Sequence, residues 1–126
     1  MKAYTDLEQS KKLAEILPIM SADMRYAPFG DTHPWVWNEE VRLLEKGSVP
    51  CWSLAALLDV LPLGLYDEFD DNDYELEINM IDKMPRYIRL GDISHSKFPW
   101  DFEKDTLIDN IVESIIWLND NNYFEP

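Results

Sequence analysis

The alternation of apolar and polar residues over Tyr74–Ile81 constrains the fold of this chain more than any other feature. Successive side chains of a strand point to opposite faces, so this segment predicts a strand with one wet face. Its apolar face would carry Leu76, Ile78 and Met80. Turn residues at Asp82–Pro85 and a second run at Arg86–Leu90 predict a returning strand. An antiparallel hairpin of this kind needs other elements to cover its apolar face.

Three segments favour helices that supply this cover. The first spans about Asp6–Leu17, with Thr5 as the N-cap and Glu8 completing a capping box, and Pro18 ends it. The second spans about Cys51–Leu61 and is apolar nearly all round, with only Ser53 and Asp59 polar. We therefore predict that it is the most buried element, with Pro50 in its first turn and a core formed by Leu54, Leu57 and Leu58.

The third helix spans about residues 105–119 and has a broad apolar stripe. A strand is expected near Asp23–Phe29 and a short one at Trp35–Trp37, whereas Asn38–Lys46 is compatible with a helix or a strand. The order is then α-β-(β)-α-β-β-α. This order predicts one α+β domain over residues 1–126, with a short antiparallel sheet of three or four strands packed with about three helices.

The charge of the chain is strongly acidic and uneven. The net charge is −14, and residues 64–126 carry 16 acidic and 5 basic residues, a net of −11. A pI near 4.3 argues against nucleic-acid or anionic-lipid partners. No apolar run is long enough for a membrane helix, no secretory signal is expected, and there is one cysteine. These features together predict a cytoplasmic protein.

Several segments resemble a family of small proteins from gut Bacteroidetes and their phages and mobile elements. The resemblance lies in residues 4–13, 21–26, 50–58 and 109–123, including Trp52-Ser53-Leu54 and Asn121-Asn122-Tyr123. The family usually opens its last helix with Asn-Pro, where this chain has Lys104-Asp105-Thr106. The resemblance implies a phage or mobile-element setting and no particular activity, substrate or active site.

Catalytic and metal-binding patterns are weak. Cys51 with His33 or His95 is the one possible thiol site, and a nucleophile needs a base within hydrogen-bond reach. Asp31, His33, Asp92 and His95 match no known metal spacing, and Leu76 stands where a calcium loop needs glycine. The four glycines are isolated, so there is no phosphate loop. We therefore predict no metal and no cofactor, and favour a non-enzyme.

Two segments are candidate binding surfaces. The run 67–77 holds seven acidic residues and no basic one, and would suit a basic protein partner; its candidates are Asp67, Glu68, Asp70, Asp71 and Asp73. The aromatic segment before the last helix offers Phe98, Trp100 and Phe102. The leading hypothesis is an accessory protein of a phage or mobile element that acts by protein–protein contact. The alternative is an acidic decoy of a basic nucleic-acid-binding protein, and the third hypothesis is a Cys51-based hydrolase.

Overall fold

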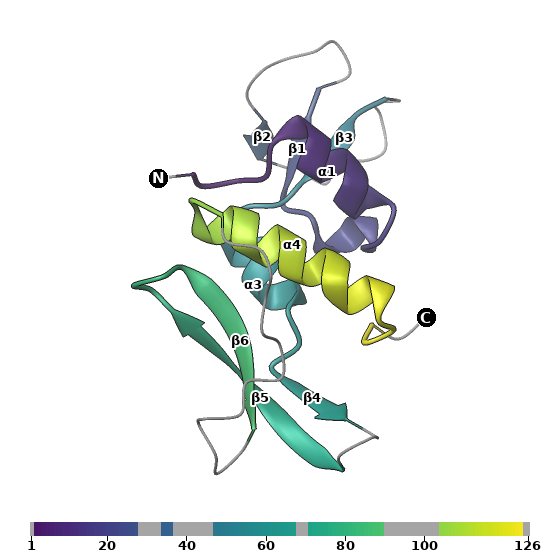
Figure 1. Cartoon of the computed structure of the whole chain (residues 1–126). Helices are drawn as coiled ribbons and strands as arrows, with labels where there is room; N and C mark the ends of the chain where they lie inside the picture. Colours follow the sequence, from purple (N-terminus) through teal and green to yellow (C-terminus); the bar gives the residue numbers. More distant parts are fainter. Residues whose placement is uncertain (1, 28–33, 37–46, 68–70, 90–103, 125–126) are drawn as a thin grey trace. The chain divides into compact units, whose positions relative to one another are not determined.

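The computed structural model describes residues 2–27, 34–36, 47–67, 71–89 and 104–124 (Figure 1). The chain divides into two compact units, Met1–Val60 and Leu61–Pro126. Each unit contains a three-stranded antiparallel sheet and at least one helix. The α+β class, the antiparallel pairing and the three helices are therefore confirmed, with the strands divided between two sheets. That residues 1–126 form one domain stays a prediction, and residues 38–46 lie outside the described part.

The described part of the first unit holds a sheet of strand order β2-β1-β3 together with two α-helices and a 3-10 turn. In chain order its elements are α1 (Leu7–Ala14), η1 (Ile19–Ser21), β1 (Met24–Tyr26), β2 (Trp35–Val36), β3 (Val49–Cys51) and α3 (Leu54–Val60). The strands expected near residues 23–29 and 35–37 are thus present, although shorter. Helix α1 packs against β3, and its Leu13 is fully buried.

The N-cap of α1 is Asp6, so the prediction of Thr5 was wrong. The Asp6 carboxylate accepts a hydrogen bond from the Gln9 backbone N–H at 2.8 Å, and the Gln9 side chain accepts one from the Asp6 backbone N–H at 3.0 Å. Thr5 is fully buried, and its hydroxyl lies 2.7 Å from that of Ser10. The same hydroxyl accepts the Trp52 backbone N–H at 3.2 Å. The Thr5 hydroxyl therefore makes tertiary hydrogen bonds, and the adjacent Asp6 caps the helix.

Pro50 and Cys51 lie in β3, not in the first turn of a helix as predicted. Strand β3 pairs with β1 in the register Met24↔Cys51 and Tyr26↔Val49. It lies at one edge of its sheet, where a proline is tolerated because one side of the strand needs no donor. Helix α3 begins only at Leu54. Ser53 is its N-cap, because the Ser53 hydroxyl accepts a hydrogen bond from the Ala56 N–H at 3.2 Å.

The prediction that this helix is the most buried element was also wrong. Leu57 is fully buried, but Leu54 and Leu58 are half-buried. Helix α4 of the second unit has seven buried positions, whereas α3 has two. A helix of seven residues presents few positions to a core, however apolar its sequence is.

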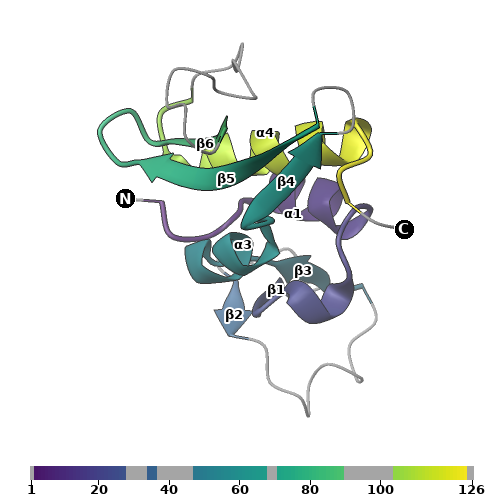
Figure 2. The same ribbon diagram turned by 90° about the horizontal axis from the view of Figure 1, so that it is seen from below.

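The second unit is built on the predicted hairpin. Its sheet has the order β4-β5-β6 and comprises β4 (Gly64–Asp67), β5 (Asn72–Asn79) and β6 (Met84–Arg89). The pairing of Asn79 with Met84 closes a four-residue turn at Met80–Lys83, earlier than the expected Asp82–Pro85. Strand β4 was not predicted. Helix α4 (Leu107–Asp120) packs beside β6 (Figure 2).

Helix α4 agrees with its prediction at both ends. The Thr106 hydroxyl accepts the Asp109 N–H at 3.1 Å at the N-cap. Past the C-terminus of α4, Asn122 has a positive φ of 64°, and Tyr123 stacks on Trp117 with ring centroids 5.8 Å apart.

Within helix α4 the Asn110 side chain is fully buried. Its amide donates to the Lys83 carbonyl at 2.7 Å, so it joins α4 to the turn of the hairpin.

Candidate functional site

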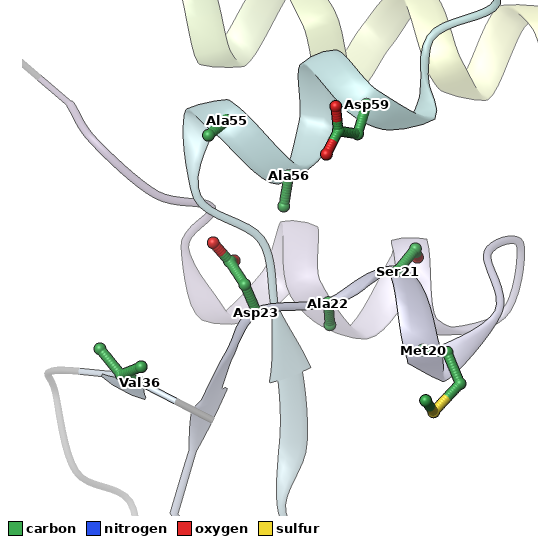
Figure 3. A pocket seen from close by; sticks show the side chains of 8 residues that line it. All are labelled: Met20, Ser21, Ala22, Asp23, Val36, Ala55, Ala56 and Asp59. Carbon is green, nitrogen blue, oxygen red and sulfur yellow. The ribbon is translucent and has the colours of Figure 1, made fainter. Parts of the chain in front are cut away.

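A pocket of about 420 Å³ opens on the first unit, between η1, the start of β1, β2 and α3 (Figure 3). Its described lining combines apolar side chains, one hydroxyl and two carboxylates: Met20, Ser21, Ala22, Asp23, Val36, Ala55, Ala56 and Asp59. None of these residues is a cation. The pocket is therefore both apolar and acidic.

Ser21, one of the lining residues, is fixed by two hydrogen bonds. Its hydroxyl donates to the Pro18 carbonyl at 2.6 Å and accepts the indole N–H of Trp52 at 2.9 Å. Trp52 is fully buried, so this contact ties η1 to the core of the unit. The neighbouring Met20 side chain, which also lines the pocket, is 67% exposed.

Asp23 has a structural role as well as a place in the lining. Its carboxylate accepts the Ser53 backbone N–H at 2.9 Å and also the Ser53 hydroxyl. Since Ser53 caps α3, Asp23 fixes where that helix begins. Figure 3 shows the Asp23 side chain reaching from the start of β1 toward α3.

Asp59 is the carboxylate of the pocket that is available to a ligand. It lies exposed on α3, and no ion pair or hydrogen bond holds it among residues that the structure describes. Val36 of β2 is 78% exposed at the opposite part of the lining. Ile19 and Trp35, next to Met20 and Val36 in sequence, are exposed as well. Apolar surface is therefore displayed around a site with negative charge.

The pocket was not found from the sequence because its residues come from four separate elements. One signal was present, since Ser53 and Asp59 are the only polar residues of the apolar run Cys51–Leu61. Ser53 caps α3, and Asp59 lines the pocket. A polar residue inside an otherwise apolar run therefore indicates a capping or binding role.

The acidic candidates are divided by the fold. Asp67 ends β4 and is only 5% exposed, so it does not belong to a solvated patch. Asp71 is exposed with a positive φ of 53° and accepts a hydrogen bond from the Tyr66 hydroxyl. Asp73 is exposed on β5, opposite Tyr66. Glu68 and Asp70 lie outside the described residues, as do the aromatic candidates Phe98, Trp100 and Phe102.

Cys51 has the environment of an inert core thiol. Its side chain is fully buried, with Sγ 3.4 Å from the Thr5 carbonyl oxygen. Burial raises the pKa of the thiol above its usual value. A nucleophile needs the opposite, an accessible thiol with a lowered pKa. His33 and His95, the suggested bases, lie outside the described part of the chain.

Two absences concern the described residues 2–27, 34–36, 47–67, 71–89 and 104–124. Within them no three His, Cys, Asp or Glu side chains gather closely enough to hold a metal ion. No helix within the same ranges combines the length and the hydrophobicity needed to cross a bilayer.

Comparison of the chain with protein-family models, with curated proteins and with solved structures finds no match in any of the three.

Proposed function

We propose that this chain is a small non-enzymatic accessory protein that acts by protein–protein contact, and that the pocket of the first unit is the contact site. The observation that supports the proposal is that exposed Met20 and Val36 line the same pocket as the Asp59 carboxylate. Exposed apolar surface rimmed by polar groups is typical of protein interaction sites. The resemblance of the sequence to a mobile-element family supports a phage or mobile element as the setting.

The chemistry of the lining defines the partner segment. The partner segment would carry an apolar side chain that contacts Val36 and Met20, and a nearby lysine or arginine that pairs with Asp59. The net charge of −14 would attract such a basic segment and raise its association rate. Binding should therefore weaken as salt rises, mainly through the association rate.

The test begins with capture of a partner from cells of the source organism by the tagged full chain. The affinity of the purified partner is then measured for Val36→Ser and Asp59→Asn. Both variants should bind more weakly, Val36→Ser by about tenfold from the lost apolar burial. Leu63→Ser is the matched control, because Leu63 is as exposed as Val36 at 78% and lies in the other unit. Equal affinity of all three variants and the wild type would contradict the proposal.

The decoy function is a second candidate, supported by the exposed face of β5. Asp73, Glu75 and Glu77 are all exposed at alternate positions, so their carboxylates follow one another about every 7 Å. A regular row of negative charge suits a basic surface that binds nucleic acid. Replacing the three acids by their amides should lower affinity for such a partner and flatten its salt dependence. An unchanged salt dependence would exclude this row from the contact.

A further inference from the structure

The turn of the β5–β6 hairpin displays two adjacent apolar side chains. Ile81 is 94% exposed and Met80 is 63% exposed. The alternation of the sequence predicts Met80 on the covered face of the strand, but β5 ends at Asn79 and the turn carries Met80 outward. We call Met80–Lys83 the hairpin tip. Adjacent exposed apolar residues of this kind suit a contact with another surface.

The hairpin tip is held in one conformation by side chains around it. The Asn79 amide oxygen accepts the Ile81 N–H at 2.9 Å, and the Asp82 carboxylate accepts the Met84 N–H at 3.1 Å. Arg86 forms an ion pair with Asp82. Asn110 of α4 donates to the Lys83 carbonyl at 2.7 Å. A preorganised tip loses little conformational entropy when it docks.

The charge of the tip contrasts with that of the chain. Arg86 pairs with Asp82, and the Lys83 ammonium, two residues after Ile81, is the cation of the tip. Lys83 is exposed and donates to the Asp105 carbonyl at 3.3 Å. An ammonium group has three donors, so it can also reach a carboxylate. The tip thus presents two apolar side chains followed by a cation.

This chemistry complements the pocket of the first unit, whose lining combines exposed Met20 and Val36 with the Asp59 carboxylate. We infer that the pocket of one copy of this chain receives the hairpin tip of a second copy. Ile81 packs on the apolar lining, and the Lys83 ammonium faces the Asp59 carboxylate. The inference rests on the proposed role of the pocket as a protein contact site and names one occupant.

The contact is small, so association is weak and depends on concentration. Two copies of net charge −14 repel each other at low salt. Screening of this repulsion over about 10 Å at 0.1 M salt favours association. The self-contact should therefore strengthen from low to moderate salt, unlike the binding of a basic partner.

The experiment is sedimentation velocity of the full chain from about 10 µM to about 500 µM at about 0.15 M NaCl. The wild type should associate as its concentration rises. Ile81→Ser removes the tip contact and Val36→Ser removes the pocket contact. Each should shift association to at least about tenfold higher concentration. Leu63→Ser should behave as the wild type does. All three side chains are exposed, so the thermal melts of the variants should match that of the wild type.

Mixing the two defective variants identifies the pairing. Ile81→Ser keeps an intact pocket and Val36→Ser keeps an intact tip. An equimolar mixture should therefore form a 1:1 complex at concentrations at which each variant alone is monomeric. A mixture that stays monomeric, or a variant that associates at the same concentration as the wild type, overturns the inference. A wild type that is monomeric throughout overturns it too. In that case a captured partner that still depends on Val36 would leave the proposed function standing.

Discussion

Replacing Asn110 by alanine should destabilise the second unit, because its amide satisfies several backbone groups at once. Its oxygen accepts the Lys104 N–H at 2.8 Å. Its NH₂ group donates to the carbonyls of Lys83 at 2.7 Å and Lys104 at 3.3 Å. The side chain is fully buried, so none of these bonds is made through exposed atoms of the amide.

The magnitude follows from these contacts. The two short hydrogen bonds contribute about 0.5–1.5 kcal/mol each, which gives about 1–3 kcal/mol. Lys83 and Lys104 are exposed, so water can reach part of the released backbone and the lower half of that range applies. We therefore expect a loss of about 1–2 kcal/mol in the free energy of unfolding.

Urea unfolding followed by circular dichroism measures this loss as a lower midpoint at constant slope. Asn121→Ala is the matched control on the same helix, because Asn121 is exposed and its amide makes a single bond to the Trp117 carbonyl at 2.9 Å. It should cost less than about 0.5 kcal/mol. If Asn110→Ala and Asn121→Ala have the same urea midpoint, the hydrogen bonds of the buried Asn110 amide do not stabilise the contact between the hairpin turn and α4.

Four further outcomes are expected. Leu57→Ala should cost about 2–5 kcal/mol, because the side chain is fully buried, and a loss below about 1 kcal/mol in urea unfolding would refute that role. The Cys51 thiol should react with a thiol reagent only on unfolding, and native protein that reacts as fast as free cysteine would show an accessible thiol. The ion pair with Arg86 lowers the pKa of Asp82 below its ordinary value of 3.8. The pair therefore stabilises the fold above that pH, and its contribution is lost as the pH falls through the lowered pKa. Asp82→Asn should accordingly be less stable than the wild type at neutral pH in urea unfolding, and this gap should close in strong acid. The melting temperature of the wild type should rise from low to moderate NaCl, since salt screens the net charge of −14, and a fall would mean that specific ion pairs outweigh the general repulsion.

Elements with a strong local pattern were predictable. The hairpin of β5 and β6 follows from alternation over Tyr74–Asn79, and α4 follows from its apolar stripe and the residues that end it. In both, the buried face and the turn or cap lie within one stretch of sequence. Short-range periodicity is then enough to identify the element.

Elements that depend on a distant partner were not predictable. Strand β4 is four residues long, and its pairing with β5 is what makes it a strand. Pro50 and Cys51 suit a helix start by composition, but pairing with β1 places them in β3. Long-range hydrogen bonds override local propensity in such short segments.

The sequence by itself determined the α+β class, the acidic character of the second unit and the hairpin, because composition and periodicity act over neighbouring residues. Tertiary structure alone decided which polar groups are used internally and which remain exposed. It buried Thr5 and Asp67, and it brought Asp59, Met20 and Val36 into the lining of one pocket. The pocket residues are distant in sequence. The pairing of β1 with β2, the Asp23–Ser53 contact and the Ser21–Trp52 contact bring their elements together.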